Sequence, residues 1–168
     1  IGTRAGVKTV ARTEEGYAID MGPWSFIHGD AAREGGEDCL VSARGLKTPR
    51  AGLSISMGNP HTVVMLGSDG KLDGLDLHSL PQVNPAPVNG TNVEFVVPVD
   101  LDVESGAHVG AIRMRVHERG VGETLSCGTG ACAAAAATRF WGGEEAPDEW
   151  LVHVPGGTLA VTFVLGPD

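Results

Sequence analysis

The segment TGACAAAAATRFW, residues 129–141, differs in character from the rest of the chain and decides the fold. Alanine is the best helix former, and residues 133–137 are all alanine. The pair Gly142-Gly143 ends the helix after about 13 residues, a length of roughly 20 Å at 1.5 Å per residue. Because a helix that is apolar on every side is buried on every side, we expect this helix at the centre of the molecule.

Short segments with the alternation of β-strands lie on both sides of this helix in the sequence. In residues 111–117, Ile112, Met114 and Val116 point one way and the side chains between them point the other. Similar patterns predict strands at 53–57, 61–66, 93–99, 150–154 and 159–165, and a hairpin formed by 7–12 and 17–21. A short helix is predicted at 72–80, with irregular loops at 23–36 and 81–90. The predicted fold class is α+β, with a mixed sheet curled into a barrel around a central buried helix.

The charge balance of the 168-residue chain argues against several classes of partner. Twelve basic and 21 acidic residues give a net charge of −9, whereas nucleic acid or an anionic membrane requires a basic surface. No apolar run approaches the roughly 20 residues that span a bilayer, and we expect no signal peptide. The cysteines Cys39, Cys127 and Cys132 form no C-x-x-C pair, so we expect a reducing, cytoplasmic location. Cys39 and Cys132 are predicted to be packing residues.

The sequence Cys127-Gly128-Thr129-Gly130 lies at the start of the predicted helix and carries the most informative chemistry. The first amides of a helix lack acceptors and carry a partial positive charge, so those of Gly128, Thr129 and Gly130 can hold a carboxylate. The same field is expected to lower the pKa of the Cys127 thiol from about 8.5. A thiolate beside a held carboxylate can move a proton at the α-carbon of an amino acid. The alternative is a helix-entry turn with an inert, buried cysteine.

Other polar residues are candidates for the same site. Glu118 and Arg119 follow a predicted strand and can bind an ammonium group and a carboxylate, or equally form a solvated ion pair. Asn59 and His61 flank a proline, and Asn92 precedes an apolar strand, where turn and capping roles are the simple explanation. Each of these signals is weak when it is taken alone.

Four segments taken together resemble the diaminopimelate epimerase family. They are GNPH at 58–61, GTNVEF at 90–95, ERGVGET at 118–124 and CGTGACA at 127–133. Their order and spacing are similar to the C-terminal half of that family. Residues 1–20 resemble the tail of the N-terminal domain, and residues 21–168 resemble the C-terminal domain without its last strand. Since the chain begins with Ile1 and not with methionine, we expect a piece of a longer polypeptide.

The resemblance implies cofactor-independent epimerisation of LL-diaminopimelate to meso-diaminopimelate, a step in the synthesis of lysine and peptidoglycan precursors. In that family one cysteine removes the α-proton and a second cysteine delivers a proton to the opposite face. The resemblance makes Cys127 one of these two cysteines and places His61 close to the reacting centre. It assigns the α-ammonium group to Glu118, the reacting carboxylate to Gly128 and Thr129, and the distal end of the substrate to Asn59, Asn92 and Arg119.

The second cysteine of the family, in a C-G-N-G motif, has no counterpart in this chain. Because inversion of a carbon centre needs an acid and a base on opposite faces, we expect the isolated chain to be inactive. Activity requires the N-terminal half or a second chain, and a homodimer is one such arrangement. Two alternatives stay open: a non-catalytic amino-acid-binding or interaction domain, and a hydrolase that uses Cys127 and His61. We expect no cofactor and no metal, because the histidines show no ligand spacing.

Overall fold

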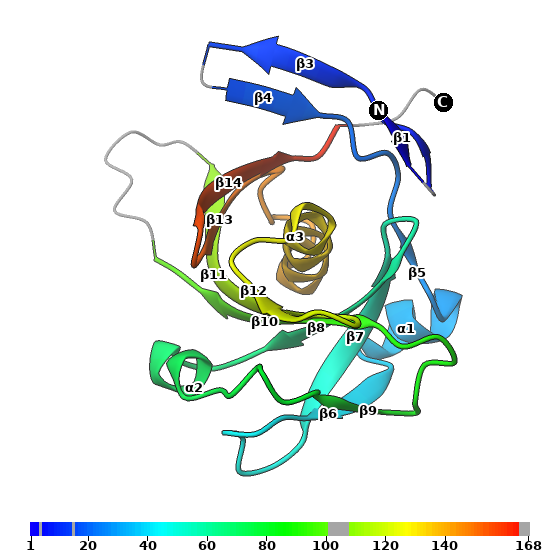
Figure 1. Ribbon diagram of the computed structural model, residues 1–168, viewed down its shortest axis with the longest axis vertical. Coiled ribbons are helices and arrows are strands. Elements are labelled where there is room, and N and C mark those ends of the chain that lie inside the picture. The colour runs from blue at the N-terminus through cyan, green and yellow to red at the C-terminus, as the bar shows by residue number, and fades with distance from the viewer. Residues whose placement is uncertain (4, 15, 101–107, 165–168) are drawn as a thin grey trace.

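The centre of the molecule is helix α3 (Gly128–Gly142), which lies in the hollow of a curled sheet (Figure 1). The computed structural model describes residues 1–3, 5–14, 16–100 and 108–164. Ala131 and Ala133–Ala137 are all buried, because small side chains let the strands approach the helix from several sides. Gly143, with a φ of 76°, ends the helix. The prediction of a central buried helix is confirmed.

The main sheet has ten strands and is mixed. Eight of them follow the order β14-β13-β11-β10-β8-β7-β6-β9, while β12 pairs with β11 and β5 pairs with β7. The pairs β8–β10 and β11–β13 are parallel, and β10–β11 and β7–β8 are antiparallel. The strands are β5 (Ser25–Phe26), β6 (Cys39–Ser42), β7 (Arg50–Ser56), β8 (Pro60–Met65), β9 (Gln82–Asn84), β10 (Asn92–Pro98), β11 (Val109–Glu118), β12 (Gly122–Thr124), β13 (Glu149–Val154) and β14 (Gly157–Thr162).

The first strands of the chain stand apart from this sheet. β1 (Gly2–Thr3) pairs with β2 (Gly6–Val7), and β3 (Val10–Thr13) pairs with β4 (Gly16–Ile19). Figure 1 shows the β3–β4 hairpin outside the curled sheet, on the side of β14. The hairpin predicted at 7–12 and 17–21 is therefore present, with Val7 belonging to the preceding pair.

Alternation along the strands gives the sheet two apolar faces. The inner face packs on α3 through Leu53, Ile55, Val63, Val96, Ile112 and Met114. The outer face is covered by α2 (Asp69–Asp73) and the segment after it. The sheet contributes Val64, Val93, Phe95 and Val97 to this outer core, and the covering segment contributes Leu72, Leu75 and Leu77. Burial on both faces explains why β10 is an almost continuous apolar run.

Several local predictions were wrong. The helix predicted at 72–80 is replaced by α2, which ends before Gly74, and Leu75 and Leu77 reach the outer core from an irregular segment. The loop predicted at 81–90 contains β9, whose flanking prolines are tolerated because β9 lies at an edge of the sheet. The loop predicted at 23–36 contains β5 and α1 (Gly29–Gly35), which buries Ala32. Strands β6 and β12 were not predicted.

The sheet is mixed and curled around α3, as predicted, but the described residues show no closed barrel. In the described residues, β14 pairs with β13 and β9 pairs with β6, and no ladder joins these two edges. Met21 and Trp24, from the segment between β4 and β5, pack against the core around α3 in place of a closing strand. Residue 165, the end of the strand predicted at 159–165, lies outside the described residues. Within the described ranges, no helix combines the length and apolar character needed to cross a membrane.

Candidate active site

The topology brings the predicted site residues together at the ends of three neighbouring strands. Strands β8 and β10 are parallel neighbours, so they begin on the same side of the sheet. The antiparallel strand β11 ends on that side. Asn59 precedes β8, Asn92 opens β10 and Glu118 closes β11. The N-terminus of α3 reaches this side of the sheet, because Asn59 Nδ2 donates a hydrogen bond of 3.3 Å to Thr129 Oγ1. The strand ends and the start of α3 therefore lie together.

Cys127 is the N-cap residue of α3 and is only 8% exposed. Its Sγ accepts a hydrogen bond of 3.4 Å from the Gly130 amide and lies 3.7 Å from Thr129 Oγ1. Of the three amides predicted to hold a carboxylate, that of Gly130 is thus engaged by the sulfur, which leaves those of Gly128 and Thr129. A Cβ atom placed on Gly128 would have no neighbour within 4 Å, so open space adjoins this turn. The turn can hold one carboxylate beside the thiol.

Burial raises the pKa of the Cys127 thiol above its ordinary value. Hydrogen bonds from Thr129 and the Gly130 amide lower this pKa, and the charges of Glu94 and Glu118 raise it further. The predicted lowering of this pKa was therefore wrong, because burial outweighs the hydrogen bonds from Thr129 and Gly130. At neutral pH Cys127 is a thiol, the form that donates a proton.

Asn92 joins two strand ends through both polar atoms of its side chain. Its Nδ2 donates a hydrogen bond of 3.1 Å to the Pro60 carbonyl, and its Oδ1 accepts one of 2.9 Å from the Arg119 amide. The exposed Arg119 side chain donates through Nη1 to the Asn89 carbonyl at 2.7 Å. The amide of Asn92 is thus engaged within the protein, where it holds the start of β8 beside the end of β11.

Glu118 is half-buried at the end of β11, and a neighbouring strand orients it. The chain turns at Gly120, which has a φ of 77°, and returns as β12. Thr124 on β12 donates its hydroxyl hydrogen bond to Glu118 Oε1. The carboxylate therefore has a defined position close enough to Cys127 to affect its pKa.

His61 is completely buried and is paired with a residue that the sequence motifs did not single out. Its Nδ1 lies 2.6 Å from Oε1 of Glu94, whose side chain is also fully buried. The available signal was a lone acidic residue inside the apolar run 93–97, two positions from Val96, which packs on the α3 side of the sheet. An acidic side chain at a position that faces the core is unusual and indicates a specific role.

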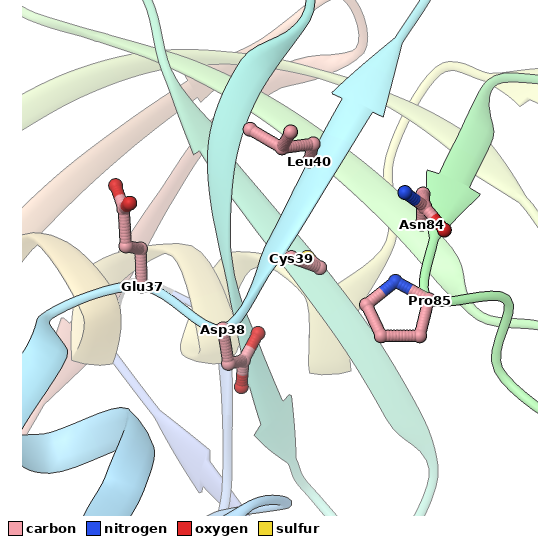
Figure 2. A pocket seen from close by; sticks show the side chains of 6 residues that line it. All are labelled: Glu37, Asp38, Cys39, Leu40, Asn84 and Pro85. Carbon is pink, nitrogen blue, oxygen red and sulfur yellow. The ribbon is translucent and has the colours of Figure 1, made fainter.

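The pKa values of the other two cysteines, Cys39 on β6 and Cys132 on α3, are also raised. Burial, aided by the charge of Asp38, raises the pKa of Cys39 to about 12, and burial raises that of Cys132 to about 11. Cys39 opens β6 in a small hollow that also includes Leu40 and Pro85 (Figure 2). Both cysteines pack against apolar clusters, in agreement with their predicted role. The described part of the chain contains no group of three or more acidic, histidine or cysteine side chains able to hold a metal ion.

Comparison with known sequences identifies the family. The sequence profile described as diaminopimelate epimerase matches residues 53–164, which is more than half of the chain. The chain belongs to the diaminopimelate epimerase family. The match includes every predicted site residue, from Asn59 to Thr129.

Three curated relatives, each named diaminopimelate epimerase, give the extent of the similarity. The protein from Streptomyces coelicolor is 40% identical over 171 residues, which covers 96% of this chain and 52% of the relative. The protein from Rhodococcus erythropolis is 37% identical over 166 residues, with 96% and 51% covered. The protein from Mycobacterium tuberculosis (strain ATCC 25618 / H37Rv) is 37% identical over 178 residues, with 99% and 56% covered. The chain spans about half the length of these relatives.

Proposed function

We propose that this chain carries one of two proton-transfer groups of a cofactor-independent epimerase that converts LL-diaminopimelate to meso-diaminopimelate. The observation that carries the proposal is the position of Cys127 at the N-cap of α3, beside the first amides of Gly128 and Thr129. Membership of the diaminopimelate epimerase family supports diaminopimelate as the proposed substrate. The reaction belongs to lysine and peptidoglycan precursor synthesis, and we place it in the cytoplasm.

In the proposed mechanism the amides of Gly128 and Thr129 bind the carboxylate beside the reacting carbon. The helix field there stabilises the enolate-like charge that develops when the α-proton leaves. A base on the opposite face takes that proton, and Cys127 delivers its own S–H proton to the carbon from the near face. Cys127 is left as a thiolate, which takes the α-proton when the reaction runs in reverse.

The other residues of the site are proposed to hold the substrate. Glu118, oriented by the Thr124 hydroxyl, binds the α-ammonium group. The distal carboxylate binds the exposed guanidinium of Arg119, which Asn92 positions through the backbone. Asn59, which is hydrogen-bonded to Thr129, lines the same space, and His61 lies behind the reacting centre.

The base on the opposite face is proposed to come from an N-terminal half or from a second chain, including a second copy in a homodimer. Strands β1–β4 pair only among themselves in the described residues, which supports their assignment to an N-terminal domain and that of residues 21–168 to a C-terminal one. Val7 is 84% exposed, Tyr17 75% and Ile19 49%. Tyr17 and Ile19 lie two positions apart on β4 and therefore share one face of the hairpin, which we propose is covered by another protein segment.

Proton NMR of LL- and meso-diaminopimelate in heavy water tests the proposal directly. The chain is measured alone and together with the N-terminal half of a family member, next to its Cys127→Ala variant and the matched Cys132→Ala control. We expect epimerisation with deuterium uptake at the α-carbon only when the second half is present. The exchange should disappear in Cys127→Ala and persist in Cys132→Ala.

A ligand-protection measurement separates this function from a non-catalytic binding domain. Diaminopimelate should slow alkylation of Cys127, and an amino acid with a single carboxylate should not. Protection without isotope exchange in the assembled protein would favour the binding domain. If diaminopimelate causes neither protection nor exchange, the result contradicts both the site assignment and the proposed substrate.

A further inference from the structure

A buried acid–base pair lies behind the first turn of α3. His61 on β8 and Glu94 on β10 approach to 2.6 Å, and neither side chain has exposed surface. Val63 and Val96, two positions further along these strands, belong to the core around α3. Side chains two positions apart in a strand share a face, so His61 and Glu94 face the helix.

The carboxylate of this pair and the sulfur of Cys127 meet at Gly130. A Cβ atom placed on Gly130 would lie 2.7 Å from Glu94 Oε1 and 3.1 Å from Cys127 Sγ. The two atoms therefore border the same small space, and a glycine at 130 is what leaves it open. Glu94 is in this way brought next to a cysteine 33 positions away in the sequence.

The pair is only half satisfied within the described part of the protein. His61 Nε2 and Glu94 Oε2 are buried and have no hydrogen-bond partner there. Buried polar atoms are nearly always paired, and a buried charge without full pairing is costly. Burial accordingly raises the pKa of Glu94, and His61 opposes this rise. Apolar side chains would join β8 and β10 at lower cost, so the pair indicates a role in function.

We infer that Glu94 is a positioning residue for proton transfer by Cys127. Its carboxyl group orients the His61 ring through Nδ1. In the ionised form, which the hydrogen bond to His61 favours, it places negative charge beside the Cys127 sulfur and helps to keep the sulfur protonated until substrate binds. Cys127 then acts as proton donor: the S–H bond breaks, a Cα–H bond forms, and the electron pair stays on sulfur. The inference deepens the proposed function and rests on it for the identity of the carbon that receives the proton.

Glu118 on β11 also acts on the Cys127 thiol, in the same direction as Glu94, and the experiment must separate the two effects. Of the other titratable groups nearby, His61 is paired with Glu94, and Cys132 lies on α3, where Cys127 raises the pKa of Cys132. Glu94→Gln keeps the size of the side chain and its ability to hydrogen-bond to His61, but it removes the charge. Glu149→Gln, at an exposed position of β13, removes the same charge elsewhere and is the matched control.

The measurement is the rate at which iodoacetamide alkylates Cys127 as a function of pH in the full 168-residue chain, with the peptide identified by mass spectrometry. Glu94→Gln should move the profile to lower pH and raise the rate at pH 7, because the charge of Glu94 raises the pKa of Cys127. Glu149→Gln should leave the profile unchanged. Proton NMR should show a hydrogen-bonded imidazole N–H far downfield in the parent chain, and Glu94→Gln should move it upfield.

An unchanged alkylation profile in folded Glu94→Gln would overturn the inference. A measured pKa below about 8.5 for Cys127 in the unsubstituted chain would also overturn it, and this measurement does not depend on the folding of a variant. A shifted profile in a protein that exchanges no diaminopimelate proton would contradict the proposed function while supporting the effect of Glu94 on Cys127. Glu118→Gln is measured in parallel, and a shift there alone would assign the effect to Glu118 and contradict the role of Glu94.

Discussion

Replacing Asn92 with alanine should lower the free energy of unfolding, because Asn92 connects the start of β8 to the end of β11. The side chain of Asn92 makes two hydrogen bonds, one to the Pro60 carbonyl and one from the Arg119 amide. Each bond contributes a net of about 0.5–1.5 kcal/mol to the free energy of unfolding. Water can replace part of this at the exposed Arg119, so we expect a loss of about 1–2 kcal/mol. In a domain of this size, such a loss lowers Tm by roughly 2–8 °C.

Thermal and urea unfolding, followed by circular dichroism, measure this loss. Asn89→Ala is the matched control, because Asn89 is exposed and its backbone carbonyl, which remains, is the acceptor for Arg119. If Asn92→Ala is as stable as Asn89→Ala within about 0.5 kcal/mol, Asn92 does not hold the strand ends together. Unchanged stability with a loss of diaminopimelate binding would instead assign Asn92 to direct contact with the substrate.

Three further predictions concern the thiols and the core. Thr129→Val should raise the pKa of Cys127 further, because it removes a hydrogen bond that lowers this pKa, and alkylation of Cys127 at pH 8 should slow. The pKa of Cys39 is raised from 9.0 to about 12, so its stabilising effect is complete below pH 9 and is lost as the pH rises toward 12. In Cys39→Ala, the free energy of unfolding measured with urea should therefore fall less steeply as the pH rises above 9. An unchanged slope would contradict this. Leu53→Ala should cost about 2–5 kcal/mol in the same assay, and Val88→Ala, at a side chain that is 98% exposed, less than about 0.5 kcal/mol.

The parts of the fold that could be predicted are those with strong local patterns. The alanine run of α3 and the alternation of β11 are visible in any short window of the sequence. The short elements around the outer core are different, because their pattern depends on the surface that they cover. Leu72, Leu75 and Leu77 are spaced for neither a regular helix nor a strand, yet all three are buried against the outer face of the sheet.

The candidate site divides in the same way. The motifs singled out Cys127 and the turn after it, and residues from four separate segments were assigned to one site by resemblance. Other features depend on how the strands pair, and a sequence motif does not specify strand register. They are the hydrogen bonds of the Asn92 side chain and the position of Glu94 beside Gly130.

By itself, the sequence determined a buried small-residue helix, a surrounding set of strands and membership of one enzyme family, because these follow from composition and local order. The tertiary structure alone decided that no strand pairing closes the sheet within the described residues and that the pKa of the Cys127 thiol is raised. The protonation of Cys127 follows from burial and from Glu94 and Glu118, which approach it only after folding. Local patterns specify which elements form, whereas a pKa depends on hydration and on the distances between charges that are remote in the chain.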